Sequence, residues 1–131
     1  MELTGNWDDD STFLYRNAAS DLEVRVERFP IGAAAKTEGL LDKIEERVKM
    51  LGPLKKATRG KVDLAGVEGG TLSVECKRVE DKETSLMEVL VFKSGAATAV
   101  SITALAPLKQ QSALASAWRQ ILAKTRIVEV Q

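Results

Sequence analysis

Histidine is absent from this chain of 131 residues, and cysteine occurs only once, as Cys76. A Ser-His-Asp triad, a Cys-His pair and a zinc site each need side chains that one such chain does not supply. The single cysteine also has no partner for a disulfide within the chain. These absences exclude the commonest nucleophilic and zinc-dependent chemistries.

A charge excess and a long apolar run are missing as well. The chain has 19 Lys and Arg residues against 19 Asp and Glu residues, so it lacks the basic surplus that supplies most nucleic-acid affinity. No apolar stretch reaches the roughly 18 residues that a membrane span needs, and the acidic start MELTGNWDDD lacks the layout of a signal peptide. We therefore expect a cytoplasmic protein with no membrane span and no nucleic-acid partner.

The residues that are present fit one domain. Hydrophobic residues make up 44% of the chain, which is enough for a single sizeable core at this length. We expect residues 1–131 to form one domain. The order of its strands does not follow from the sequence.

Two segments alternate between apolar and polar residues, as half-buried strands do. Residues 21–29 (DLEVRVERF) place three aliphatic side chains on one face and charged side chains on the other. Residues 71–79 (TLSVECKRV) place Cys76 on the same face as Leu72 and Val74. We expect a buried and slowly reacting thiol there.

Further strands are expected on both sides of these two. Residues 86–92 (LMEVLVF) are apolar on both faces except at Glu88, which is typical of a central strand covered from both sides. Residues 98–106 favour a strand that stops at Pro107. Residues 55–64 are only weakly strand-like, and AGVEGG after them predicts a turn.

Two segments have helical periodicity. Residues 37–51 carry an apolar stripe, with Thr37 as a plausible N-cap and Gly52-Pro53 as the stop. Residues 110–124 carry a second stripe, on which Trp118 is expected to anchor the core. Short connections between consecutive strands favour antiparallel pairing. The expected fold class is α+β, with an antiparallel sheet and two main helices.

The stretch NWDDDS is the first candidate for a functional site. Asp8, Asp9 and Asp10 could ligate a hard cation, but the spaced acidic pattern of a calcium loop is absent. Aspartate also begins turns readily. We expect a solvated turn here and no specific metal site.

Carboxylates on strands are the second candidate. An acid-base pair of the glycosidase type needs two of them facing each other across a substrate, whereas charged residues on an outward strand face usually form cross-strand ion pairs. The glycine-rich GVEGGT lacks the spacing of a phosphate-binding loop. We expect no catalytic residue, no cofactor and no enzymatic activity. The four carboxylates considered are Glu23, Glu27, Glu75 and Glu88.

A family resemblance covers nearly the whole chain. It is carried by NWDDDS, the strand LEVRVERF, the helix TEGLLDKIEERVKML, the meander GGTLSVECKR, MEVLVFKSG and AVSITALAP, and the final helix with Trp118. In this order the blocks resemble the Mog/PsbP-like fold, and more narrowly its bacterial branch of DcrB-like proteins and Eag chaperones of type VI secretion. The resemblance implies a twisted antiparallel sheet packed with helices.

The same resemblance implies a function. Eag chaperones dimerise and hold hydrophobic helices of a secreted effector, so the chain is expected to be a homodimeric adaptor or chaperone for a partner protein. Arg28 matches the arginine that ends a strand in that branch, and it is the expected polar contact. The alternative is a structural or accessory protein that binds a folded partner, like other members of the fold.

One strand supplies the expected apolar contacts. If Glu88 lies on a polar face, then Leu86, Leu90 and Phe92 share that face and need cover. A helix of the same chain, a dimer partner or a bound client could provide it. We expect these three residues and Arg28 to form the partner-binding surface if the cover is a client.

Overall fold

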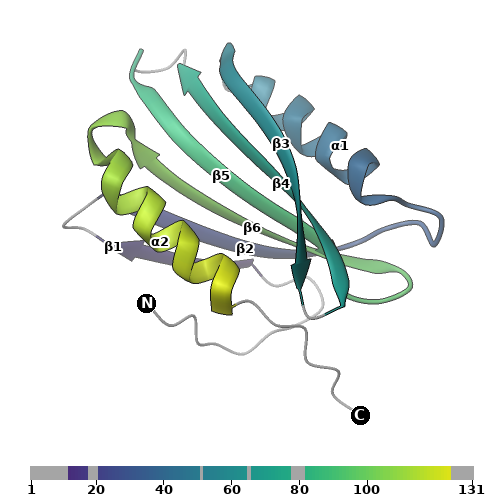
Figure 1. Ribbon diagram of the computed structural model, residues 1–131. Helices are drawn as coiled ribbons and strands as arrows, with labels where there is room; N and C mark the ends of the chain where they lie inside the picture. Colours follow the sequence, from purple (N-terminus) through teal and green to yellow (C-terminus); the bar gives the residue numbers. More distant parts are fainter. Residues whose placement is uncertain (1–11, 18–20, 51, 65, 78–81, 125–131) are drawn as a thin grey trace.

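The computed structural model describes residues 12–17, 21–50, 52–64, 66–77 and 82–124 (Figure 1). Six antiparallel strands form one sheet in the order β1-β2-β6-β5-β4-β3. A short 3-10 turn at Leu108–Gln110 leads into the second of two helices. The strands are β1 (Thr12–Asn17), β2 (Leu22–Pro30), β3 (Leu54–Leu64), β4 (Val67–Lys77), β5 (Thr84–Lys93) and β6 (Thr98–Pro107), and the helices are α1 (Thr37–Lys49) and α2 (Gln111–Lys124).

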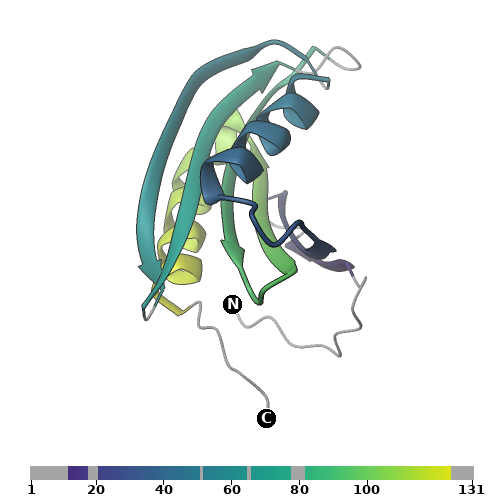
Figure 2. The same cartoon turned by 90° about the vertical axis from the view of Figure 1, so that its right-hand side faces the viewer.

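The two helices cover opposite faces of a strongly curved sheet. Helix α2 lies in front of the sheet in Figure 1, and α1 lies on the far side of β3 and β4. Figure 2 shows the curvature, with the sheet bending around α2. Helix α1 packs on β4 and β5, whereas α2 packs on β6. The α+β class and the antiparallel sheet with two main helices are confirmed.

Each helix closes its own core. Leu114, Trp118 and Ile121 of α2 pack on one sheet face, and Leu40, Leu41 and Val48 of α1 pack on the other. Strand β5 contributes to both cores because its alternate residues point to opposite faces. On the α2 side it supplies Leu86, Leu90 and Phe92, and on the α1 side Met87, Val89 and Val91. The prediction of a central strand covered on both sides is therefore confirmed.

Helix α1 lies very close to β4 at one glycine. A Cβ atom on Gly70 would stand 2.5 Å from Cγ2 of Thr37 and 2.8 Å from Cδ1 of Leu41. Real Cβ atoms do not approach other carbons so closely, because packed interiors leave no such overlap. The absent side chain of Gly70 thus lets the first turns of α1 contact the sheet directly.

Two local predictions were wrong. Thr37 is the first helical residue, and Lys36 occupies the N-cap position without a capping side-chain hydrogen bond. The segment AGVEGG is not a turn throughout, because β4 begins at Val67, and residues 67–70 pair with residues 61–64 at the end of β3. Strand pairing outweighs the weak strand propensity of glycine there. Asp8 to Asp10 lie outside the described residues.

Candidate binding groove

The sheet face toward α1 has two unlike halves. Its β4 and β5 half presents buried aliphatic side chains such as Leu72 and Val89. Its β2 half instead presents Glu23, Arg25 and Glu27, which are paired in register with β6 residues of the same face. An amphipathic helix buries its apolar stripe where the sheet is apolar. Helix α1 therefore packs on the first half and leaves the second half open.

A groove of about 350 Å³ lies along this boundary, between α1 and β2. Its lining combines an apolar floor, two hydroxyl side chains and a charged rim, and we call it the α1 groove. The volume falls in the range of pockets that hold a small ligand or a few side chains. The lining residues are Met87, Ser101, Thr103 and Leu105 from the sheet, Ile44, Arg47 and Val48 from α1, and Glu23, Arg25 and Glu27 from β2.

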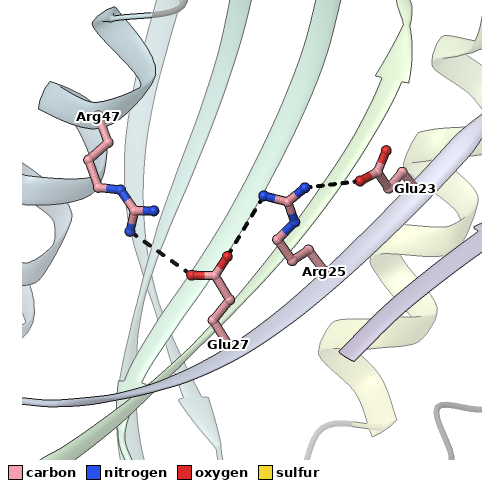
Figure 3. Close-up of polar contacts among 4 residues, drawn as sticks. All are labelled: Glu23, Arg25, Glu27 and Arg47. Atoms are coloured by element: carbon pink, nitrogen blue, oxygen red, sulfur yellow. Dashed lines mark hydrogen bonds and ion pairs between the residues drawn. The ribbon is translucent and has the colours of Figure 1, made fainter. Parts of the chain in front are cut away.

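The rim is a chain of ion pairs that crosses from β2 to α1 (Figure 3). Arg25 contacts Glu23 at 3.3 Å and Glu27 at 3.9 Å, and Arg47 contacts the other oxygen of Glu27 at 4.0 Å. Side-chain exposure is 50% for Arg25 and 72% for Arg47. Exposed pairs of this kind contribute only about 0 to 1 kcal/mol each. The two arginines and two glutamates of the rim balance in charge, and such weak ion pairs rearrange easily.

The α1 groove continues into an acidic end. A smaller cavity of about 190 Å³ shares Glu23 and Leu105 with the groove and is further lined by Asp21, Glu83 and Ser85. Among the described residues that line it, three are carboxylates and none is Lys or Arg. No group of three or more His, Cys, Asp or Glu in the described part of the chain is placed to hold a metal ion. We call Asp21, Glu23 and Glu83 the acidic end.

The apolar residues predicted to contact a partner lie on the opposite face. Leu90 is completely buried, and Leu86 and Phe92 are 8% and 5% exposed. All three belong to the core that α2 closes. Of the three kinds of cover considered from the sequence, a helix of the same chain is the one observed. In this conformation none of the three is open to a partner.

Arg28, the predicted polar contact, lies with them on the α2 face. It sits on β2 opposite Val100 of β6 and is partly buried. Neither Arg28 nor the three apolar residues line the α1 groove. The structure brings Arg28 and the apolar set to one face, but that face is closed by α2.

The strand carboxylates divide between the two faces. Glu23 and Glu27 lie in the rim of the α1 groove, and both contact Arg25. Glu75 pairs with Lys56 at 3.6 Å on the α2 face. Ion pairs are thus present for these three carboxylates. Among their contacts that the described residues show, only that of Glu75 with Lys56 is of the expected strand-to-strand kind, since Glu23 and Glu27 pair with Arg25 of their own strand.

Glu88 differs from the other carboxylates. It accepts a hydrogen bond of 2.7 Å from Ser73 Oγ on the neighbouring strand. Burial raises the pKa of Glu88 above the usual glutamate range, and the hydrogen bond from Ser73 opposes part of that rise. A raised pKa alone does not make an acid-base pair, since Ser73 is its only partner that the structure shows.

The thiol of Cys76 lies on the buried face of its strand, as the alternating sequence pattern predicted. Cys76 is 1% exposed and belongs to the α1-side core together with Leu72 and Val74. Its Sγ lies 3.8 Å from the carbonyl oxygen of Gly52. The prediction of burial is confirmed, and slow labelling by thiol reagents remains a prediction.

Sequence reasoning did not identify the α1 groove. The signal that could have found it is the run Glu23-x-Arg25-x-Glu27, a charged strand face too polar to lie under a helix. The run lies on β2, which pairs with β6, and three other strands separate β2 from β6 in the chain. The residues of the groove floor could therefore not be predicted without knowing this long-range pairing.

Comparisons with known proteins give the fold and no family. No protein-family model matches the chain, and no curated protein does either. PA94 of Pseudomonas aeruginosa, a protein of unknown function described as a candidate regulator, matches with a TM-score of 0.73 at 14% identity, over 99% of this chain and 92% of PA94. LpqN of Mycobacterium tuberculosis, involved in cell envelope biogenesis, matches with a TM-score of 0.69 at 13% identity, over 90% of this chain and 71% of LpqN. The chain is thus similar in fold to both proteins.

Proposed function

We propose that the protein is a non-enzymatic adaptor or chaperone that holds a hydrophobic segment of a partner protein in the α1 groove. The observation that carries this proposal is the open, apolar-floored groove beside α1, on a sheet whose other face is closed by α2. Contact through the sheet was expected from the sequence. The burial of Leu86, Leu90 and Phe92 moves the proposed contact to the other face.

The groove has suitable chemistry for a segment with apolar anchors. Met87, Leu105 and Ile44 offer apolar surface, while the hydroxyl groups of Ser101 and Thr103 can meet polar atoms of a bound backbone. Burying one anchor side chain contributes roughly 1.5 to 3 kcal/mol. An amphipathic helix or an extended segment can both use such anchors.

The finer identity of the partner rests on resemblance alone. The resemblance to the Eag branch of the Mog/PsbP-like fold suggests a secreted effector with apolar helices, a homodimeric chaperone and a cytoplasmic location. In the described residues no helix is long and apolar enough to cross a membrane. Light scattering that returned only the mass of one chain would contradict the dimer.

Affinity purification from the native host tests the function. The wild-type chain is compared with Thr103→Trp, in which the indole fills the floor of the α1 groove, and with Lys61→Gln on β3 as a surface control. We expect the wild type and Lys61→Gln to retain the same partner and Thr103→Trp to lose it, while circular dichroism shows all three folded.

Other outcomes of this purification distinguish the alternatives. Retention of a folded partner by all three variants would favour the structural or accessory protein over the chaperone. Reproducible turnover of a substrate by the purified chain would contradict the non-enzymatic proposal altogether.

A further inference from the structure

We propose that the partner segment lies in the α1 groove as an extended chain along β6, with its backbone against the hydroxyl groups of Ser101 and Thr103. The inference rests on the proposed function and adds the conformation and the residue pattern of the segment. Its basis is a buried hydroxyl group that has no hydrogen-bond partner among the described residues.

Ser101 is an exception in the interior of the chain. It is 7% exposed, and the one other buried polar residue among those described is Ser85, at 6%. The structure shows no hydrogen-bond partner for either hydroxyl in the described part of the chain. Ser101 lines the α1 groove, and Ser85 lines the cavity beside it. A ligand that displaces water from the groove must therefore offer Ser101 a new partner or lose affinity.

Thr103 lies in register with Ser101. The two residues are two positions apart on β6 and project from the same face, so they are separated by about 6.8 Å along the strand. The N–H and C=O groups along one edge of an extended chain repeat at the same distance. A hydroxyl both donates and accepts, so it can pair with either backbone group. The two hydroxyls thus match an extended backbone that runs alongside β6.

A helix offers no such match. Its backbone N–H and C=O groups bond to one another within the helix. Unless polar side chains interrupted it, the apolar stripe of a helix would cover Ser101 and Thr103 without supplying partners. An extended chain has the opposite need, because its own backbone groups require partners once they leave water. The floor of the α1 groove therefore favours the extended chain.

The walls of the α1 groove predict an alternating sequence for this segment. On one side of β6 the lining includes Ile44 and Val48 of α1, and on the other it includes Arg25 and Glu27 of β2. When one edge of an extended backbone faces the floor, successive side chains point to the two walls in turn. We expect apolar and polar residues to alternate. The contact of Arg47 with Glu27, which joins the walls in Figure 3, is exposed and weak enough to open for the segment.

The probe is a library of random twelve-residue peptides displayed on phage and selected on the purified full chain. Enriched peptides should alternate apolar and polar residues, without the spacing of three and four that a helix uses. N-methylation of single residues in the best peptide should weaken it at every second position, because one edge of the backbone faces the hydroxyls. Ser101→Ala and Thr103→Val should each weaken it by about two- to tenfold, as loss of one hydrogen bond does.

Controls separate the contact from the fold. Thr58→Val removes an exposed hydroxyl on β3 away from the groove, and it should leave the affinity unchanged. The free Ser101→Ala chain should melt no lower than the wild type, since this hydroxyl has no hydrogen-bond partner in the described chain. Amide chemical shifts of Ser101, Thr103 and Leu105 in the wild type should move on peptide addition, which locates the peptide.

Three results would overturn the inference, and they differ from failure of the proposed function. Peptides that shift the groove amides but bind Ser101→Ala and Thr103→Val as tightly as the wild type would refute the backbone contact and leave the groove as a binding site. Apolar residues spaced by three and four, with N-methylation effects that do not alternate, would show that a helix binds. A lower melting temperature of free Ser101→Ala would show that the hydroxyl supports the fold and not a ligand. If no selected peptide shifts the groove amides, the proposed function fails along with the inference.

Discussion

The two faces of the sheet carry the same number of helices but differ in how completely they are closed. On the α2 side, β2, β6 and β5 supply apolar side chains to the core that α2 closes, and Arg28 and Glu88 are polar exceptions on that face. On the α1 side, β2 is charged, and only the β4 and β5 part lies under a helix. The α2 side of the sheet therefore carries a core, whereas the α1 side carries a core and, beside it, the α1 groove.

This difference follows from one strand. The apolar residues of β2 (Leu22, Val24 and Val26) face α2, and the charged residues between them face α1. Because successive side chains of a strand point to opposite faces, one alternating segment makes one face closed and the other open. The proposed binding site thus lies where the charged face of β2 offers α1 no apolar surface to cover.

The largest expected effect contrasts Leu90 with Thr103. Leu90→Asp places a carboxylate in the closed core, where water cannot reach and hydrate it. The substitution should therefore lower the free energy of unfolding by about 4 kcal/mol or more. Thr103→Asp, opposite Arg25 on the groove floor, should change it by less than about 1 kcal/mol. Chemical denaturation followed by circular dichroism measures both. Equal losses would mean that the two faces are closed alike.

A smaller effect tests how tightly α1 is held. Gly70→Ala adds a methyl group that overlaps α1 and should cost about 1 to 3 kcal/mol, as overpacking does. Gly39→Ala lies within α1 with nothing near its added methyl group, so it should stabilise the chain by up to about 1 kcal/mol through helix propensity. Thermal melting of the two variants is the comparison. A neutral Gly70→Ala would show that α1 can slide away from β4.

Much of the closed face could be predicted from sequence, because its residues repeat with the period of a strand or a helix. The segments of α1, α2 and the central strand β5 were expected close to their observed bounds, and Cys76 was expected to be buried. The α1 groove could not be predicted in the same way. Its floor and rim come from α1, β2, β5 and β6, and only the strand order brings these segments together.

The cover over the predicted partner-binding residues could not be assigned from the sequence for the same reason. The pattern shows correctly that Leu86, Leu90 and Phe92 share a face with Glu88 and need cover. It does not show that α2, which follows β6 in the chain, returns to that face. Which face a helix covers depends on tertiary connections that periodicity alone does not encode.

A pH experiment sharpens the comparison on the α2 face. The folded-state pKa of Glu88 is raised by burial, so the native state binds this proton more tightly than the unfolded state. The stability that protonated Glu88 provides is present below the ordinary glutamate pKa and is lost as the pH rises through the folded-state value. Glu88→Gln should remove that loss and be more stable than wild type at neutral pH by no more than about 1 kcal/mol, since the side chain is partly exposed. Urea unfolding of both proteins at pH values from 4 to 8, in steps of about one pH unit, measures this difference in stability. A wild type that gains stability relative to Glu88→Gln as the pH rises over this range would contradict the assignment.

The smallest effect concerns the rim of the α1 groove. A double-mutant cycle of Glu27→Gln and Arg47→Gln should give a coupling of less than about 0.5 kcal/mol, because the pair is exposed and 4.0 Å apart. Partner binding should strengthen the coupling if the segment excludes water from the rim. A large coupling in the free chain would mean that the rim is a rigid structural clamp and not an adaptable edge.

The most direct measurement is thiol labelling of Thr103→Cys, with the native Cys76 as an internal control in the same chain. Mass spectrometry follows the labelling rate at both positions, with and without the partner that co-purifies with the wild type. We predict fast labelling at position 103 in the free chain, strong protection when the partner is bound, and slow labelling of Cys76 in both states. Equal rates at position 103 with and without partner, or labelling there as slow as at Cys76, would contradict the claim that the α1 groove is the open binding site.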